Sequence, residues 1–379
     1  MHSKHSRTTD NAPLSNNAID KTALAGKIKR WGKELGFSSV GIARADVAKA
    51  SARLERWLEL GRHGGMDYMV KHRALRAAPA ALVPGTISVI SARMPYWQQS
   101  TESERVLVNG DLAYISRYAL GRDYHRKVRR QLTRLAEYIA TALAETQPGV
   151  PFIYRAFSDS APVMEVEFAI QAGIAWRGKH TLALARDGSW HFLGELYTSL
   201  DLPADAVGNE HCGTCSRCLE TCPTSAIVAP YEIDANRCVS YLTIELHGPI
   251  PLPLRPLIGN RIYGCDDCQL CCPWNRFARI GDPDFAARNG LDNVRLVDLF
   301  AWDAQEFEQR LAGSPIRRVG HTRWLRNVAV ALGNAAPTKD VEAALLTRGD
   351  HPSALVREHV AWALSRIRGA ASLDRCPEA

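Results

Sequence analysis

The chain has 379 residues, of which 46% are hydrophobic and 23% charged, and its formal net charge at pH 7 is +7. This balance is typical of a soluble globular protein of two or three domains and excludes a disordered or fibrous chain. No apolar run approaches the ~18 residues that a membrane helix needs. The N-terminus lacks an apolar signal core, so we expect a cytoplasmic protein whose ten cysteines bind metal rather than form disulfides.

The first elements are a tail, a helix and two strands. Residues 1–19 are polar and without periodicity, which predicts a disordered tail. Asp20 is placed to cap a helix that Gly36 ends, and its apolar positions follow helical spacing: Leu24, Ile28, Trp31 and Leu35. Residues 37–42 and 87–90 predict short buried strands.

The next elements continue a mixed pattern. A long helix is predicted from apolar positions at helical spacing, Leu132, Leu135, Ile139 and Leu143. Residues 151–157 predict a strand and residues 163–173 a helix, so that Asp159 lies where the strand gives way to the helix. Residues 182–193 predict a hairpin around an Asp187-Gly188 turn. Together these elements predict an α+β domain that extends to about residue 200.

Two cysteine runs give the most specific chemical information in the chain. They are Cys212-Gly-Thr-Cys215-Ser-Arg-Cys218-Leu-Glu-Thr-Cys222-Pro223 and Cys265-Asp-Asp-Cys268-Gln-Leu-Cys271-Cys272-Pro273. The first has the bacterial ferredoxin spacing C-x2-C-x2-C-x3-C-P, in which three thiolates bind one [4Fe-4S] cluster and the cysteine before proline binds a second. A zinc site typically uses two C-x2-C pairs and does not explain these runs. We therefore predict a ferredoxin-like domain with two [4Fe-4S] clusters.

The same spacing rule divides the ligands between the clusters. One cluster receives Cys212, Cys215, Cys218 and Cys272, and the other receives Cys222, Cys265 and Cys268. The second set needs a fourth thiolate, for which Cys238 and Cys271 are the alternatives. Cys271 has the right spacing, but its neighbour Cys272 is directed to the other cluster, so we prefer Cys238. Cys376 is far from both runs and is expected to be a free thiol.

The C-terminal region is predicted to be helical and in part basic. Residues 328–332 (Val-Ala-Val-Ala-Leu) recur as residues 360–364 (Val-Ala-Trp-Ala-Leu), which predicts paired helices resembling HEAT repeats. Basic residues gather in residues 117–134 and again in residues 317–326, where no acid is present. Each patch alone is as well explained by a solvated helix face, and both have the charge expected of a nucleic-acid binder.

Several segments together resemble the epoxyqueuosine reductases. They are Tyr114-Ile-Ser-Arg-Tyr-Ala119, Gly121-Arg-Asp-Tyr-His125, Asp159-Ser-Ala-Pro-Val-Met-Glu165, Gly178-Lys-His-Thr181, the two cysteine runs and residues 317–334. The resemblance implies a cobalamin-dependent enzyme that converts epoxyqueuosine to queuosine at the wobble position of the tRNA anticodon. It also implies a reductive-dehalogenase-like cobalamin-binding domain, clusters that deliver electrons to the cobalt, and an external donor of the flavodoxin or ferredoxin type.

The resemblance also implies roles for individual residues. Without it, Asp159 is more often a helix N-cap; with it, Asp159 is the catalytic acid that protonates the epoxide oxygen, and partial burial predicts a raised pKa. Cobalamin is implied to contact Arg117, Tyr118, Asp159, Met164, Glu165, Val166 and His180, the last standing where the family pattern has asparagine. The tRNA is implied to contact Arg317, Arg318, Arg323, Arg326 and Asn327. Cys271 is an additional thiol and is expected to be a spectator.

The predicted organisation is α+β and multidomain. It consists of the tail (1–19), a cobalamin-binding catalytic domain (20–200), a ferredoxin-like two-cluster domain (201–285) and a HEAT-like helical tRNA-binding region (286–379). Nothing in the sequence requires an oligomer, so we expect a monomer.

Two other functions compete with this interpretation of the sequence. A corrinoid reductive dehalogenase of small organohalides does not need a basic helical repeat, and a non-enzymatic electron carrier leaves the N-terminal domain unexplained.

Overall fold

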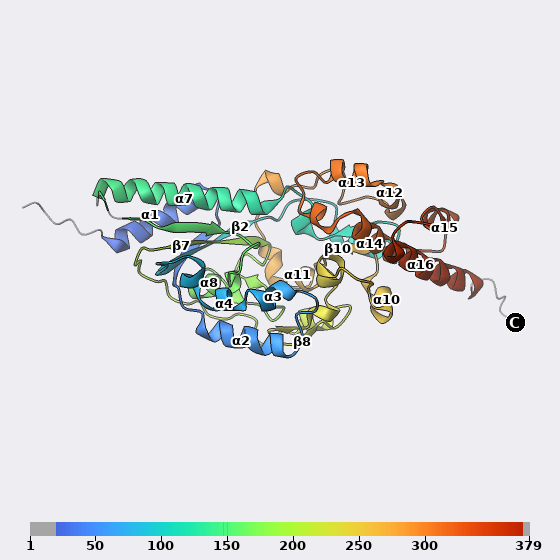
Figure 1. The fold of residues 1–379 in the computed structure, drawn as a ribbon, viewed down its shortest axis with the longest axis horizontal. Coiled ribbons are helices and arrows are strands. Elements are labelled where there is room, and N and C mark those ends of the chain that lie inside the picture. Colours follow the sequence, from blue (N-terminus) through green and yellow to red (C-terminus); the bar gives the residue numbers. More distant parts are fainter. Residues whose placement is uncertain (1–19, 147, 150, 374–379) are drawn as a thin grey trace, which may run out of the picture.

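A four-stranded antiparallel sheet organises the N-terminal half of the chain (Figure 1). The computed structural model describes residues 20–373 except 147 and 150, so the predicted tail and Cys376 lie outside the described residues. The strands are β1 (Ser39–Arg44), β2 (Ser88–Pro95), β7 (His191–Thr198) and β4 (Tyr154–Phe157), in the order β1-β2-β7-β4. Ile42 pairs with Ile90, and Ile90 pairs with Leu196, so these three side chains share one face of the sheet.

Helices cover both faces of this sheet (Figure 1). On one face α1 (Lys21–Glu34) and α7 (Tyr124–Thr146) bury apolar side chains such as Ile28 and Leu132 against the sheet. On the other face α2 (Ala48–Glu59) and α8 (Glu165–Gln171) contribute Ala50 and Phe168 to a second core. The predicted first helix is confirmed, because Asp20 accepts hydrogen bonds from the first-turn amides and Gly36 follows with a φ of +92°.

The predicted hairpin at residues 182–193 is wrong in its pairing. Ala185 and Gly188 do form a bridge across the turn, but β6 (Ala183–Leu184) pairs with β5 (Trp176–Arg177). The second predicted arm is β7, which pairs instead with β2 and β4. A strand between two partners satisfies its backbone groups on both edges, and this pairing outweighs the local preference of the turn.

The cysteine runs lie in a region of short elements that is joined to the N-terminal half. These elements are α9 (Arg217–Glu220), β8 (Ile227–Ala229), β9 (Glu232–Ile233), α10 (Arg255–Ile258), β10 (Arg261–Tyr263) and α11 (Asp267–Leu270). The join is a parallel pairing of β10 with β3 (Tyr114–Ile115), which follows α6 (Ser103–Val108). Beside it the Asn260 side chain donates to three backbone carbonyls between residues 106 and 112, at 2.7–3.1 Å.

The C-terminal region is helical, as predicted. Its helices are α12 (Leu296–Ala301), α13 (Ala304–Arg310), α14 (His321–Asn334), α15 (Lys339–Leu346) and α16 (Ala354–Leu373). The two similar segments lie on α14 and α16, which pack so closely that a Cβ on Gly333 would lie 2.6 Å from the Trp362 ring. The assignment of these helices to HEAT repeats stays a prediction. No helix in the described part of the chain combines the length and apolarity needed to cross a membrane.

Candidate functional site

Asp159 occupies a strained turn between β4 and α8. Its φ is +59°, a region that aspartate tolerates better than most residues and that is often found at functional sites. The turn is held because the Asp159 amide donates to the Glu165 carboxylate in the first turn of α8. The Asp159 side chain, 55% exposed, lines a cavity of about 480 Å³. The carboxylate is therefore accessible to a ligand.

A chain of hydrogen bonds leads from this carboxylate into the protein. Asp159 Oδ2 accepts from the Tyr124 hydroxyl at 2.6 Å and lies 2.9 Å from His125 Nε2, a nitrogen that Arg318 Nη1 also approaches at 3.0 Å. His125 Nδ1 donates in turn to Asp123 Oδ1 at 2.6 Å. The His125 side chain is only 3% exposed, so the imidazole is shielded from solvent while Asp159 is not. Asp123, Tyr124 and His125 stand at the start of α7, and no role was predicted for them from the sequence.

These contacts set the protonation of the site. Burial tends to raise the pKa of Asp159, but the hydrogen bonds from His125 and Tyr124 outweigh it and leave the pKa below its ordinary value. Burial tends to lower the pKa of His125, but its bonds to Asp123 and Asp159 outweigh it and raise the pKa. The expectation of a raised Asp159 pKa is therefore wrong. The Asp159 carboxylate is ionised near neutral pH, and the raised pKa of His125 favours the protonated form of its imidazole.

Two further carboxyl groups lie next to Asp159 and behave differently. Burial, followed by the charge of Asp159, raises the pKa of Glu165 to about 8. Burial also raises the pKa of Glu195, which is fully buried on β7 next to Glu165 and accepts a hydrogen bond from Ser91 Oγ at 3.2 Å. Glu165 and Glu195 therefore hold protons beside the ionised Asp159.

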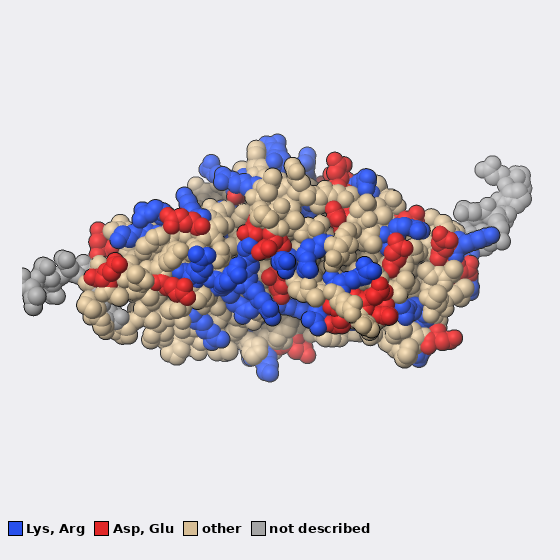
Figure 2. Space-filling model, turned by 90° about the horizontal axis from the view of Figure 1, so that it is seen from above, with Lys and Arg blue, Asp and Glu red and all other residues tan. Residues whose placement is uncertain are grey.

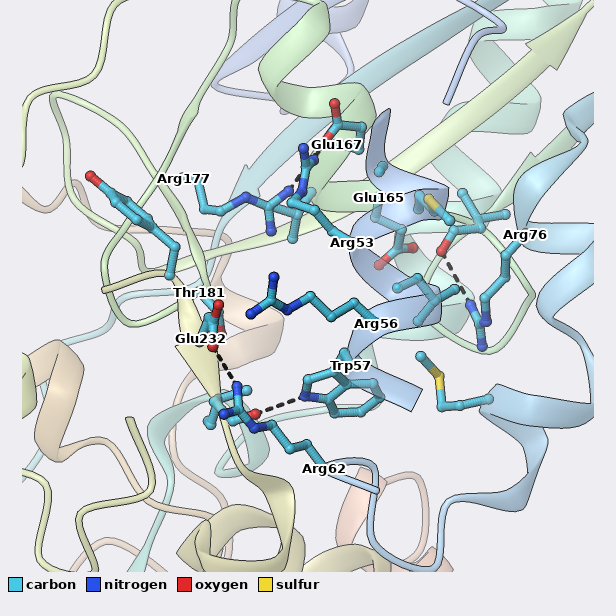
Figure 3. A pocket seen from close by; sticks show the side chains of 18 of the residues that line it. Arg53, Arg56, Trp57, Arg62, Arg76, Glu165, Glu167, Arg177, Thr181 and Glu232 are labelled. Carbon is cyan, nitrogen blue, oxygen red and sulfur yellow. Dashed lines mark hydrogen bonds and ion pairs between the residues drawn. The ribbon is translucent and has the colours of Figure 1, made fainter. Parts of the chain in front are cut away.

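The cavity has an aromatic and arginine-rich wall contributed by α2 (Figure 3). Trp57 is fixed there because its Nε1 donates to the Ile233 carbonyl at 2.7 Å. Four of the residues expected to contact cobalamin line the cavity: Asp159, Met164, Glu165 and Val166. The sequence led to no prediction for α2, because its residues carry no motif that indicates a ligand.

Three other residues expected at the cofactor do not line this cavity. Arg117 is buried over the Trp97 ring and donates to Ser103 and Ser100. Tyr118 packs against the Tyr124 ring, which places it behind the proton chain. His180 is buried next to the cavity residue Thr181, and its Nε2 has no hydrogen-bond partner among the described residues. Burial lowers the pKa of His180 to about 4, so its imidazole is neutral.

The cysteines of the two runs approach one another in the folded chain. Cys218 has Cys212 and Cys272 as electrostatic neighbours, as the crossing arrangement requires. Cys238 lies near Cys222, and Cys268 lies near Cys238, so a residue from outside both runs joins the second set. Cys271 lies among the first set, near Cys218 and Cys215, and its Sγ faces the Cys268 carbonyl at 3.6 Å.

Comparisons with known proteins agree with this site. A family model described as "Epoxyqueuosine reductase QueG, DUF1730" matches residues 76–160, and one described as "4Fe-4S double cluster binding domain" matches residues 211–275. The epoxyqueuosine reductase of Pseudomonas aeruginosa is 55% identical over 359 residues, which cover 93% of this chain and 98% of that relative. This chain belongs to the epoxyqueuosine reductase family.

Solved structures of epoxyqueuosine reductases have the same fold. A crystal structure of one with an epoxyqueuosine-modified tRNA-Tyr stem loop matches with a TM-score of 0.82 at 24% identity, over 95% of this chain and 96% of that chain. The structure of the Streptococcus thermophilus enzyme matches with a TM-score of 0.79 at 28% identity, over 92% of each chain. The predicted family and the oxidoreductase class are confirmed, as is the presence of a double-cluster domain.

The fold brings the two basic patches of the chain together. Arg318, from the C-terminal patch, donates to Asp123 at the start of α7 at 3.0 Å. Arg126 and Arg129 on α7 are exposed, as are Arg317 and Arg318. Lys and Arg side chains gather near the middle of the face shown in Figure 2. A positive surface therefore adjoins the His125–Asp159 chain.

The other C-terminal residues expected at the tRNA have different environments. Arg326 is 0% exposed and donates to the carbonyls of residues 242, 246 and 248, and Asn327, 1% exposed, donates to those of residues 243 and 262. The expectation of tRNA contact does not hold for these two, because buried side chains with satisfied polar groups cannot reach a ligand. Arg323 is half-buried and also donates to backbone carbonyls.

Proposed function

We propose that this chain reduces epoxyqueuosine to queuosine in tRNA, with cobalamin in the cavity beside Asp159 and two [4Fe-4S] clusters as the electron path. The observation that carries the proposal is the Asp123–His125–Asp159 hydrogen-bond chain, which ends at the cavity wall. Conversion of the epoxide to an alkene takes up two electrons and two protons and releases the oxygen as water. The site therefore has to deliver protons to an oxygen while electrons arrive from the cysteine region.

The residues of the cavity suit a large ligand that is apolar at its centre and polar at its edge. Leu54, Trp57 and Val166 provide apolar surface, and arginines and carboxyl groups surround them. Met164, Glu165 and Val166 would contact the ring, and the neutral His180 beside the cavity has an Nε2 still available for hydrogen bonding. Bound cobalamin would supply the electron-rich cobalt that cleavage of the carbon–oxygen bonds requires.

Asp159 and His125 divide the work of proton transfer. His125 stores the proton in a buried position, and Asp159, which is half-exposed, contacts the substrate. As negative charge develops on the epoxide oxygen, Asp159 passes on the proton it receives from His125 Nε2. Burial and the charge of Asp159 raise the pKa of Tyr124, so its hydroxyl keeps its proton. This hydroxyl stabilises the Asp159 carboxylate by donating a hydrogen bond to it. General acid catalysis of this kind contributes roughly 10²–10⁴-fold to a rate.

The proposed cluster ligands are those favoured by the spacing rule. Cys212, Cys215, Cys218 and Cys272 would hold one cluster, and Cys222, Cys238, Cys265 and Cys268 the other. Cys238 and Cys271 both lie near Cys268, but Cys238 also lies near Cys222, whereas Cys271 lies near Cys215 and Cys218 of the other set, and this supports the choice of Cys238. An external donor of the flavodoxin or ferredoxin type would supply the electrons.

The proposed tRNA contacts are Arg317 and Arg318, with Arg323 at their edge. These exposed arginines lie beside the proton chain through the Arg318–Asp123 pair, so phosphates bound there would bring the anticodon loop near Asp159. A solved relative of the same fold contains a tRNA stem loop, which supports an RNA substrate. We further propose that the enzyme acts as a monomer in the cytoplasm.

The test is anaerobic reconstitution of the clusters, addition of cobalamin and nucleoside mass spectrometry of epoxyqueuosine-containing tRNA. We expect queuosine from the wild type and a loss of roughly 10²–10⁴-fold for Asp159→Asn, with cobalamin still bound. Asparagine tolerates the positive φ of this position, so the variant should fold. Absence of cobalamin binding would overturn the cofactor proposal, and turnover of organohalides without queuosine would favour a dehalogenase.

A further inference from the structure

One part of the cavity wall plays no role in the proton chain. It contains Arg53, Arg56, Arg62 and Arg177. Arg53 and Arg177 share the Glu167 carboxylate, and Arg62 pairs with Glu232. The side chain of Arg56 has neither a hydrogen bond nor an ion pair with any other residue in the described part of the chain.

Arg56 is an exposed residue whose side chain lines the cavity. Figure 3 shows its side chain crossing the middle of the cavity, with the guanidinium pointing away from Glu165 and Arg76 and toward Arg177 and Thr181. This wall carries four arginines, Arg53, Arg56, Arg62 and Arg177, against the two carboxylates of Glu167 and Glu232, which leaves an excess of positive charge. Burial and then the charge of Arg53 lower the pKa of Arg177, as crowded cations do.

We propose that Arg56 binds the phosphodiester in the nucleotide tail of the corrinoid and so selects complete cobalamin over corrinoids without that tail. The inference rests on the proposed function, in which cobalamin occupies this cavity. The phosphodiester carries the negative charge of the tail, whereas the amides around the corrin ring are neutral. Asp159 repels an anion at its own part of the cavity, and the planar fork of Arg56 attracts one on the arginine side.

A phosphate of the tRNA has the same chemistry and is the alternative source of such an anion. The tail is favoured because Arg56 lies within the cavity wall, whereas Arg317 and Arg318, the proposed tRNA contacts, are not among the residues that line it. A tail phosphate would also be fixed at one end of the ligand, and this contact would set the orientation of the ring relative to Asp159.

The experiment compares two corrinoids on the cluster-loaded protein without tRNA. Wild type, Arg56→Gln, Arg56→Lys and the control Arg73→Gln are titrated with cobalamin and with cobinamide, which lacks the nucleotide tail, and bound corrinoid is measured by absorbance after ultrafiltration. Arg73 pairs with Glu55 outside the cavity lining and offers a matched loss of one exposed charge. Arg56→Gln should weaken cobalamin binding about ten- to a hundredfold, leave cobinamide binding unchanged and be partly rescued in Arg56→Lys.

Each other outcome overturns a defined part of the argument. Equal weakening of both corrinoids by Arg56→Gln would assign Arg56 to the ring and not to the tail. Unchanged cobalamin binding would refute the contact with the tail. A separate titration of the same variants with tRNA over a salt series would then assign the anion to the tRNA if Arg56→Gln bound it more weakly and with a smaller salt dependence. If the wild type bound neither corrinoid, the cofactor proposal itself would fail. If Arg73→Gln weakened cobalamin binding to the same extent, the loss in Arg56→Gln would be explained by the removal of one positive charge and not by a contact with the phosphodiester.

Discussion

The Asp123 carboxylate determines where the proton of the site resides. Its side chain is 19% exposed, and its pKa lies at about 2 against an ordinary 3.8. Burial opposes this shift, so the hydrogen bond and charge of His125, with the charge of Arg318, produce it. The difference, 3.8 minus about 2, corresponds to about 2.4 kcal/mol. This net free energy gives the order of magnitude of what Asp123 contributes to holding the proton on His125.

We predict that Asp123→Asn moves the alkaline limb of the pH–rate profile to lower pH. The folded pKa of His125 is raised, so its proton is bound below that pKa and is lost as the pH rises through it. Without the Asp123 charge this loss occurs at lower pH. The rate should be almost unchanged on the acid side and should fall by roughly 60-fold on the alkaline side, the equivalent of that free energy.

The assay is single-turnover formation of queuosine over a pH series. Asp284→Asn is the matched control, because Asp284 also accepts a hydrogen bond from α7, from Lys127, but has no hydrogen bond or ion pair with His125. The Asp284→Asn control should have the alkaline limb of its pH–rate profile at the same pH as the wild type. A loss of rate by the same factor at every pH would refute the reasoning, since it would mean that Asp123 only supports the local fold.

Three further predictions follow from the cysteines and the arginines. Cys238→Ser should lose about half of the iron and Cys271→Ser none of it, and the reverse result in iron analysis would make Cys271 the ligand. Charge removal at Arg317 and Arg318 should weaken tRNA binding and reduce the salt slope by roughly 0.7 per lost phosphate contact, whereas an unchanged slope over a salt series would exclude them. Arg326→Leu should lower the thermal unfolding midpoint, because each buried carbonyl left unpaired costs about 1–3 kcal/mol, and a midpoint equal to the wild type would contradict the structural role.

Some features of this protein are local, and the sequence predicted them. The spacing within each cysteine run depends only on short loops, so the double-cluster domain followed from the chain itself. The first helix was also predictable, because Asp20 caps it from an adjacent position and its apolar residues repeat at the helical period. The turn that holds Asp159 was located for the same reason, between a strand and a helix of recognisable pattern.

The tertiary structure decided the features that depend on distant partners. The pKa of Asp159 fell rather than rose because Tyr124 and His125, on another helix, donate to its carboxylate, and a pKa reflects neighbours in space. Arg326 looked like a tRNA ligand until the fold buried it among backbone carbonyls, because burial depends on what packs against a helix and not on its sequence. The sequence by itself thus determined the family and the cluster motif, while packing decided which charged residues face the ligand and which of them hold a proton.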